Sequence, residues 1–486
     1  MKIGRASGIL LHPTCLPGRF GIGDLGAESY RFADFLHQAK QKVWHVLPLG
    51  PTGPQNSPYQ CRSAFAGNPL LISPNKLAEE GYLDKRDLAQ VPGFSSTRVD
   101  FRAVGFYKFP LFRRAFGSFT ETKAYLEFAK RNDTWLDPFA QFMALRTANR
   151  GVSWTRFEPT IQASNEEIRF NKFLQYEFFR QWNQLRTYCA ERNILIMGDM
   201  PFYVEHDSAD VWHSPRLFDL DERGEPRTVG GVPPDYFSRD GQLWGNPTYR
   251  WDRLEKEKYG WWVERFRAAF RFVDLLRLDH FRGFEKFWKV PAGQPTARKG
   301  HWSKGPGIKL FRAVLKNLGS LPLIAENLGV ITPEVEALRR TLRLPGMAVL
   351  QFGFADDGPH RPTNYVRDLV SFTGTHDNDT TRGWWTALKH AAQNHPRSRA
   401  TAEVDRVKSY FQTNGNDISW SFIQAIMTSV AQISLIPMQD VLNLGGFARM
   451  NVPGRANGNW GWRYQSKAIT PGLTSRLRKL TEVSGR

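Results

Sequence analysis

The sequence predicts an α/β protein built on a (β/α)8 barrel with helical and loop insertions between its strands. Three observations predict this fold. Short apolar runs recur eight times along the 486 residues, segments with amphipathic helical patterns separate them, and several runs end in an acidic residue. Continuous Val, Ile and Leu runs are typical of buried parallel strands, and strands that alternate with helices indicate βα units.

The eight apolar runs are spread over the whole chain. They are ASGILLH near residue 9, KVWHVLPL near 46, ILIMGDM near 197, LLRLDH near 277, PLIAEN near 324, MAVLQFG near 350, LVSFTGTHD near 373 and ISLIPMQDVL near 436. Several lead into acidic residues, namely Asp199, Asp279, Glu326, Asp377 and Asp440. Because the carboxyl ends of barrel strands form the active face, we expect these side chains to gather at one end of the barrel.

The spacing of the runs predicts where the insertions lie. The gap between the second and third runs is too long for one crossover, so we predict a mainly helical insertion at 74–165, after a first part of the barrel at 1–73 that carries a substrate loop. Residues 166–486 are predicted to complete the barrel. Within them, 202–250 is rich in Gly, Pro and aromatic residues, and we expect a long irregular loop over the active site, because such segments are usually functional.

Composition and charge exclude several classes of protein. With 41% hydrophobic residues and no low-complexity tract, the chain is neither disordered nor fibrous. The formal net charge of +19 comes from basic residues that are spread along the chain, which favours a solvated basic surface over a specific nucleic-acid site. No stretch reaches the ~20 apolar residues of a membrane helix.

The chain has three cysteines, Cys15, Cys61 and Cys189, which cannot all form disulfides and lack the spacing of a zinc site. We therefore expect reduced thiols and a cytoplasmic protein.

The acidic residues at the strand ends allow a catalytic and a structural interpretation. Cleavage of a glycosidic bond with retention uses two carboxyl groups about 5 Å apart, a nucleophile and a proton donor with a raised pKa. Arg277 lies two residues before Asp279 and therefore on the same side of a strand, where its guanidinium would keep the carboxylate ionised. A purely structural ion pair between Arg277 and Asp279 explains the two residues equally well. Glu326 is either a desolvated acid or a solvent-facing residue at a helix start. Asp377 and Asp199 are either part of the site or helix caps.

Aromatic residues in the predicted loops favour a sugar site, because the apolar faces of pyranose rings stack on aromatic rings. These residues are Tyr59, Tyr203, Tyr236, Phe237 and Trp244. A single one is more typical of local packing, whereas five of them together favour ligand contact. The motifs GxGxxG, GxxxxGK[ST], HExxH and GxSxG are absent, which removes support for nucleotide, zinc-protease and serine-hydrolase functions.

Long motifs over nearly the whole chain resemble glycoside hydrolase family 77, the amylomaltases or 4-α-glucanotransferases (disproportionating enzymes) of the α-amylase clan. The motifs are GILLHPTCLPGRFGIGDLG, LPLGPTGPQNSPYQCRSAFAGNPLLI, GDMPFYVEHDSADVW, GVPPDYFSRDGQLWGNPTYRW, RLDHFRGF, AENLGVITPEV, GMAVLQFGF, GTHDNDTTRGWW and RMNVPGRANGNWGWRY. The resemblance implies a TIM barrel with no C-terminal β-sandwich, and an enzyme without a metal or another cofactor.

The resemblance also implies an activity and a role for each site residue. α-1,4-Glucan segments would pass to the 4-hydroxyl of glucose or of another α-1,4-glucan, such as a maltooligosaccharide, by a double displacement. Asp279 would attack the anomeric carbon, Glu326 would be the acid and base, and Asp377 would hold sugar hydroxyls of the distorted ring. Further substrate contacts are expected at Ser57, Tyr59, Asp199, Trp244, Arg277, Asp356, His376 and Asn451.

Two segments depart from the family pattern, and two other functions remain as alternatives. The family usually has AEDLG where Asn327 follows Glu326, and TGYGDSPYQ where this chain has TGPQNSPYQ, so we expect altered groove contacts at 54–56. A glucan hydrolase with the same carboxylates is one alternative and a non-catalytic glucan-binding protein is the other. No specific nucleic-acid or membrane partner is expected, and the sequence does not determine the oligomeric state.

Overall fold

A computed structural model describes residues 4–234, 239–355 and 357–486, and eight parallel strands form its central sheet. The strands are β1 (Ala6–Leu10), β2 (Val43–His45), β3 (Leu195–Met200), β6 (Leu275–Leu278), β9 (Leu323–Ala325), β10 (Gly346–Val349), β11 (Leu369–Phe372) and β12 (Ile433–Pro437). Their order is β10-β11-β12-β1-β2-β3-β6-β9. The backbone N–H of Ala325 donates to the carbonyl of Pro345 at 2.9 Å and nearly closes the cylinder between β9 and β10. The predicted (β/α)8 barrel is therefore confirmed, and each strand overlaps one of the eight apolar runs.

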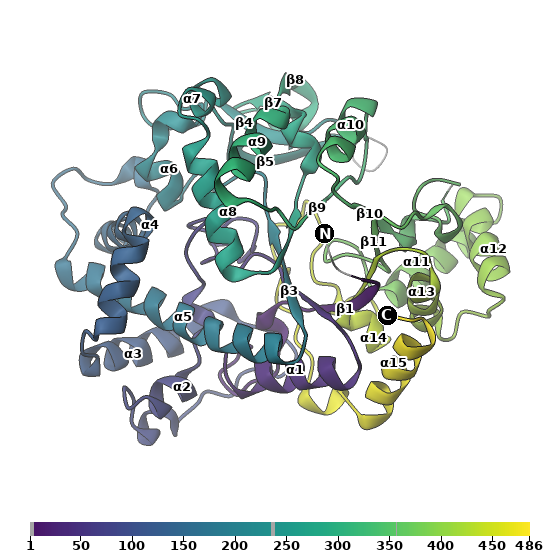
Figure 1. The fold of residues 1–486 in the computed structure, drawn as a ribbon, viewed down its shortest axis with the longest axis horizontal. Helices are drawn as coiled ribbons and strands as arrows, with labels where there is room; N and C mark the ends of the chain where they lie inside the picture. Colours follow the sequence, from purple (N-terminus) through teal and green to yellow (C-terminus); the bar gives the residue numbers. More distant parts are fainter. Residues whose placement is uncertain (1–3, 235–238, 356) are drawn as a thin grey trace.

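Helices surround the strands (Figure 1). They are α1 (Ala27–Gln38), α5 (Asn165–Glu191), α8 (Gly260–Phe272), α9 (Gly307–Leu318), α10 (Pro333–Thr341), α11 (Thr381–Asn394), α12 (Arg399–Phe411), α13 (Ile418–Thr428), α14 (Met438–Val441) and α15 (Pro471–Val483). Helix α9 shows why these segments are helical: Leu310, Phe311 and Val314 recur at helical spacing and are buried, and Gly319 ends the helix with φ of 80°. Between β10 and β11 the described residues form only the short 3-10 helices Leu350–Phe352 and Pro362–Asn364.

The barrel interior has an apolar layer below a polar one. Side chains alternate along a strand, so Met197 and Leu275 point into the barrel together with Ile324, and all three belong to one buried cluster. The next inward positions on β3 and β6 are Asp199 and Arg277, which are partners in the strand register. The polar side chains therefore lie at the carboxyl ends of the strands, above a dry floor.

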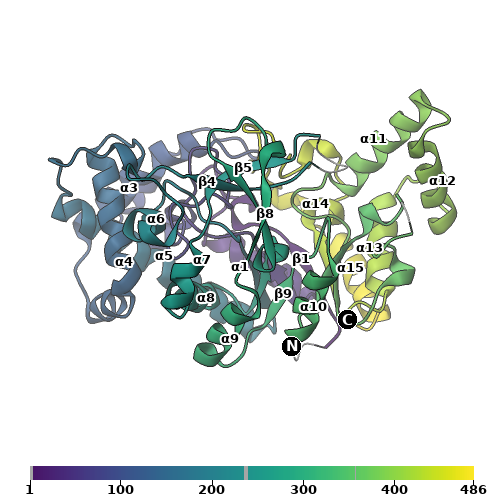
Figure 2. The same ribbon diagram turned by 90° about the horizontal axis from the view of Figure 1, so that it is seen from above.

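The segment from 74 to 165 contains three α-helices. They are α2 (Pro74–Glu79), α3 (Phe101–Ser118) and α4 (Lys123–Ala148). Thr122 caps α4, since its hydroxyl accepts a hydrogen bond from the backbone N–H of Tyr125 at 3.2 Å. These helices lie together on one side of the barrel, with α5 beside them (Figures 1 and 2). The proposed limits of the helical insertion remain a prediction.

The segment from 202 to 250 is not the irregular loop that the sequence predicts. It contains α6 (Ala209–His213), β4 (Thr228–Val232) and β5 (Gln242–Pro247), with α7 (Trp251–Lys256) directly after it. Strands β4 and β5 join β7 (Lys286–Pro291) and β8 (His301–Lys304) in an antiparallel sheet of order β5-β4-β7-β8. The sequence pattern missed this sheet because β4, TVGGV, has two glycines and no alternation, and its partner β7 comes only after β6.

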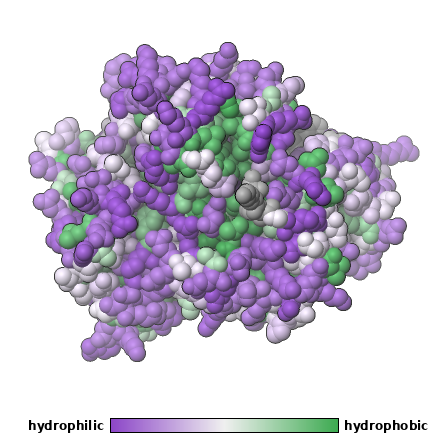
Figure 3. All heavy atoms as spheres, viewed as in Figure 1, coloured by the Kyte–Doolittle hydropathy of each residue, from purple (hydrophilic) through white to green (hydrophobic). Residues whose placement is uncertain are grey.

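The chain after β12 forms α14, α15 and short turns, and in the described residues no β-sandwich follows the barrel, as predicted. Hydrophilic residues cover most of the face in Figure 3, and hydrophobic residues gather near its middle. None of the described helices combines the length and the apolar character needed to cross a membrane.

Candidate active site

Arg277 connects two carboxylates at the carboxyl ends of β3 and β6. Its side chain is buried, and Nη1 lies 2.5 Å from Oδ2 of Asp199 and 3.0 Å from Oδ1 of Asp279. The backbone N–H of Asp279 donates to the carbonyl of Met200 at 3.1 Å, which holds the start of this loop against β3. A planar guanidinium with several donors can neutralise both acids at once.

Glu326, at the end of β9, is held next to Asp279 by backbone donors. Its Oε2 accepts a hydrogen bond from the N–H of His280 at 2.8 Å, and its Oε1 accepts one from Leu328 at 2.9 Å. His280 directly follows Asp279 and has φ of 52°, an unusual conformation for a non-glycine residue. The turn at His280 therefore connects the segments that carry the two carboxyl groups.

The two carboxyl groups titrate as a pair. Burial raises the pKa of Asp279 to about 8, although Arg277 opposes the rise, and Asp199 and Glu326 add to it. Burial also raises the pKa of Glu326, against the lowering by Arg277 and by its two backbone donors. When two carboxyl groups are coupled in this way, the apparent pKa of about 8 describes the loss of the last proton that the pair shares, and it does not belong to one residue. The pair therefore retains one proton near neutral pH.

The loop after β11 brings Asp377 and His376 to the same end of the barrel. Oδ2 of Asp377 lies 3.4 Å from Nε2 of His376, and its Oδ1 accepts a hydrogen bond from Nδ2 of Asn451 at 2.6 Å. The N–H of Asn451 donates to the carbonyl of His376 at 3.1 Å. Burial lowers the pKa of His376, which keeps the ring neutral, and Asp377 opposes this shift.

Asp440, at the end of the barrel, fixes both ends of this loop. Its Oδ2 accepts hydrogen bonds from the hydroxyls of Thr373 and Thr381 at 2.6 and 2.7 Å, and its Oδ1 accepts one from the N–H of Thr381 at 2.7 Å. The side chain is fully buried. Asp440 therefore holds the loop that carries Asp377 without approaching it directly.

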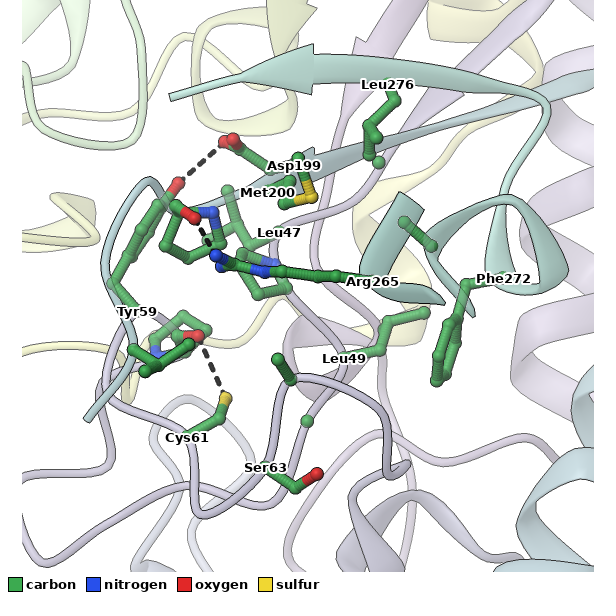
Figure 4. A pocket seen from close by; sticks show the side chains of 18 of the residues that line it. Leu47, Leu49, Tyr59, Cys61, Ser63, Asp199, Met200, Arg265, Phe272 and Leu276 are labelled. Atoms are coloured by element: carbon green, nitrogen blue, oxygen red, sulfur yellow. Dashed lines mark hydrogen bonds between the residues drawn. The ribbon is translucent and has the colours of Figure 1, made fainter. Parts of the chain in front are cut away.

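Aromatic rings form the wall beside Asp199. The hydroxyl of Tyr59 donates to Oδ2 of Asp199 at 2.8 Å, and the Tyr59 ring stacks on His376 with centroids 4.9 Å apart. Trp460 lies next to both rings, 5.9 Å from Tyr59 and 6.0 Å from His376. Figure 4 shows Tyr59 and Asp199 at the edge of a pocket. Mostly apolar side chains line its deeper part, among them Leu47, Leu49, Phe272 and Leu276.

Trp244 brings the antiparallel sheet into contact with the catalytic loop. It lies on β5, and its ring meets the ring of His280 edge to face with centroids 4.8 Å apart. Tyr203 lies on its other side at 6.0 Å. The sheet that the sequence did not predict thus places an indole next to Asp279.

The structure brings most of the predicted site residues together, but not all of them. Ser57 has a local role, since its hydroxyl accepts a hydrogen bond from the N–H of Tyr59 at 3.2 Å and so shapes the turn that presents this ring. Asp356 lies outside the described residues, as do two of the loop aromatics, Tyr236 and Phe237.

Sequence reasoning missed His280 and Trp460. The one signal for His280 was its place directly after the proposed nucleophile, and the signal for Trp460 was a tryptophan inside RANGNWGW. Neither signal indicates contact without the fold. Among the described His, Cys, Asp and Glu residues, no group of three or more is placed to hold a metal ion.

The strand ends of this barrel bring together carboxylates, an arginine and aromatic rings. This arrangement is typical of a barrel enzyme whose carboxylates act on a polyhydroxylated ligand. Comparison with known proteins gives the family. A family model described as 4-alpha-glucanotransferase matches residues 11–470. The chain belongs to this family, glycoside hydrolase family 77, and is a hexosyl-transferring enzyme, as the sequence motifs predicted.

Relatives match over the full chain. The 4-alpha-glucanotransferase of Synechocystis sp. is 46% identical over 506 residues, which cover 99% of this chain and 98% of the relative. The one from Thermus thermophilus is also 46% identical and is covered completely. Among solved structures, the amylomaltase from Streptococcus agalactiae in complex with acarbose has a TM-score of 0.93 at 34% identity, with 99% of both chains covered.

Proposed function

We propose that this enzyme transfers segments of α-1,4-glucans to the 4-hydroxyl of glucose or of another α-1,4-glucan, with Asp279 as the nucleophile and Glu326 as the acid and base. One observation carries this assignment. The pair retains one proton, and of the two carboxyl groups it is Asp279 that forms an ion pair with Arg277, at 3.0 Å. The negative charge therefore belongs on Asp279 and the proton on Glu326.

The first half of the reaction follows from this charge distribution. A carboxylate oxygen of Asp279 attacks the anomeric carbon while the bond from that carbon to the leaving 4-oxygen breaks. Glu326 gives its proton to the leaving oxygen, so the departing chain is a neutral alcohol. The products of this half are a glycosyl ester on Asp279 and an ionised Glu326.

The second half reverses the proton transfer. Ionised Glu326 takes the proton from the 4-hydroxyl of the acceptor, whose oxygen attacks the anomeric carbon and displaces Asp279. Two inversions give net retention. The two backbone donors on Glu326 stabilise its ionised form between the halves, at 2.8 and 2.9 Å.

Asp377 and its neighbours are proposed to hold the sugar ring that reacts. Asp377 remains half-exposed, with 48% of its side chain accessible, and its oxygens are therefore open to hydroxyl donors. Asn451 and His376 orient it from the protein side. Tyr59 and Trp244 offer ring faces or edges for pyranose contact. The complex of the Streptococcus agalactiae relative with acarbose supports a sugar ligand for this chain.

Incubation with maltotriose tests the proposal. We expect glucose together with a ladder of oligomers longer than maltotriose, and no ladder from Asp279→Asn. Products no longer than the substrate would identify a hydrolase instead. A full ladder from folded Asp279→Asn would show that the nucleophile is another residue.

We also propose that the enzyme works in the cytoplasm. Its three cysteines are free, and burial raises the pKa of the Cys15 and Cys189 thiols to about 12, which keeps them protonated and unreactive. Free thiols are typical of reducing compartments. Fractionation of the source cells, followed by detection with an antibody, tests this location. Recovery with secreted or envelope proteins would contradict it.

A further inference from the structure

A pair of tryptophans lies on one face of the antiparallel sheet, outside the site described above. Trp288 on β7 and Trp302 on β8 are partners in the strand register, and their ring centroids are 5.1 Å apart. β8 is the edge strand of this sheet. The label β8 stands at the top of Figure 1, far from α3 and α4.

The two rings differ in how much of them is buried. Trp288 is fixed, because its Nε1 donates to the carbonyl of Ala297 at 2.8 Å and its ring packs against Val229 and Val290. Trp302 is 38% exposed. Part of the Trp302 ring therefore stays open to solvent and to a ligand, whereas Trp288 supports it from the sheet.

Trp302 is joined to both segments that carry the catalytic carboxyl groups. The guanidinium of Arg282 lies 3.9 Å from the centre of its ring. Arg282 follows Asp279 by three residues, and its Nη1 donates to the carbonyl of Val330, in the loop after Glu326. Arg282 thus connects the Trp288–Trp302 platform to the loops that follow Asp279 and Glu326.

The surroundings of the platform are polar, with basic side chains and one acidic partner, since the ammonium of Lys286 lies 3.5 Å from a carboxylate oxygen of Glu285. Lys286 and Lys304 face each other in the register on the same side of the sheet as the two rings. Their ammonium groups can donate to sugar hydroxyls, while the part of the Trp302 ring that Arg282 does not cover can contact a pyranose ring. Rings with donors beside them match an α-glucan, which offers an apolar ring face and a hydroxyl rim.

We propose that the Trp288–Trp302 platform is a second, noncatalytic binding site for the α-1,4-glucan chain whose reacting bond lies at Asp279. This inference rests on the proposed function. A chain long enough to reach both places is held at two points, which raises its effective concentration at the catalytic site. A trisaccharide is too short to gain this advantage.

The test compares Trp302→Ala, Trp302→Phe and Phe106→Ala. Phe106 is a matched control, because it is an aromatic side chain on α3 that is 69% exposed. Each protein is run on native gels that contain amylose, and its initial rates on amylose and on maltotriose are measured. For Trp302→Ala we expect weaker retardation and a fall of about threefold to tenfold in the ratio of the amylose rate to the maltotriose rate. Trp302→Phe retains most of both properties, and Phe106→Ala retains all of them.

Other outcomes would overturn the inference. Folded Trp302→Ala with the retardation and rate ratio of the parent enzyme would remove the role of Trp302. Retardation in the amylose gel that persists in excess maltoheptaose would show that it does not come from a site for the α-1,4-glucan chain. If the parent enzyme forms a ladder of products from maltotriose but Trp302→Ala keeps the parent's retardation and rate ratio, the platform is refuted and the proposed function stands. A parent enzyme without a ladder refutes the proposed function.

Discussion

Replacement of Arg277 by Met removes the charge that keeps Asp279 ionised and nearly preserves the length of the side chain. In the structure one guanidinium nitrogen lies 2.5 Å from Asp199 and 3.0 Å from Asp279. Arg277→Met therefore leaves two buried carboxyl groups without their cation. We expect Asp279 to take up a proton, because an unpaired buried charge is costly.

The size of the effect follows from Coulomb's law. Two unit charges about 4 Å apart interact by about 4 kcal/mol at an effective dielectric constant of ~20. That energy corresponds to about 3 pKa units, and because Arg277 lowers the pKa of Asp279, its loss raises this pKa further. The ionised nucleophile becomes scarcer at neutral pH, and kcat/KM for maltotriose falls by about 10² to 10³.

The assay is the initial rate of glucose release from maltotriose as a function of pH. Loss of the guanidinium moves the acid limb of the profile to higher pH, since more alkaline solution is needed to ionise Asp279. Arg265→Met is the control: Arg265 is equally buried, and it donates to the carbonyl of Phe202 and the hydroxyl of Tyr249, both at 3.0 Å. This variant loses stability but keeps the position of the acid limb.

One result would refute the reasoning. If Arg277→Met is folded by circular dichroism, with kcat/KM within about threefold of the parent enzyme and an unmoved acid limb, Arg277 does not govern the ionisation of Asp279. The assignment of the negative charge to Asp279 would then lose its basis.

Three further predictions concern stability. Because burial raises the pKa of the Asp279 and Glu326 pair, the stability that their shared proton contributes is present at acid pH and is lost as the pH rises towards about 8. Asp279→Asn removes one of the two buried charges, so it should melt about 3 °C above the parent at pH 8, with a smaller difference near pH 5, by calorimetry. Asn327→Asp replaces the amide that donates to Glu336 at 2.9 Å by a second carboxylate, so it should lower the free energy of unfolding in urea by about 1–3 kcal/mol at pH 7. This loss should disappear below about pH 5, and an unchanged urea midpoint of unfolding at pH 7 contradicts the prediction. Asp440→Leu leaves the N–H of Thr381 and two threonine hydroxyls without their acceptor, so we expect a loss of about 2 kcal/mol and a higher KM for maltotriose, because the loop that carries Asp377 loosens. A lower stability with unchanged KM would limit Asp440 to folding.

The barrel strands could be predicted because their signal is local. Each buried parallel strand is a continuous apolar run, and an acidic residue after the run marks the carboxyl end. The ion pair between Arg277 and Asp199 could not be predicted, because it depends on the register between β3 and β6. The antiparallel sheet was missed for a similar reason: its strands come from two separate insertions, and their pairing leaves no periodic pattern in either.

The site residues divide in the same way. The sequence motifs indicated Asp279 and Glu326, and the structure shows that the turn at His280 joins them. The same motifs did not distinguish Ser57, which shapes a turn, from Tyr59, which reaches Asp199. Only tertiary contacts separate such neighbours, because both lie in the same short loop.

The seam between β9 and β10 gives the barrel an uneven stiffness. In the residues that the structure describes, this seam is closed by the bond from Ala325 to Pro345 and by the bond from the N–H of Met347 to Oδ1 of Asn327, whereas the other neighbouring strands pair over at least three residues. Amide hydrogens along the seam should therefore exchange with solvent sooner than those of β1 or β12. Glu326 directly follows β9, so the proton donor is carried by the strand that separates most easily from its neighbour.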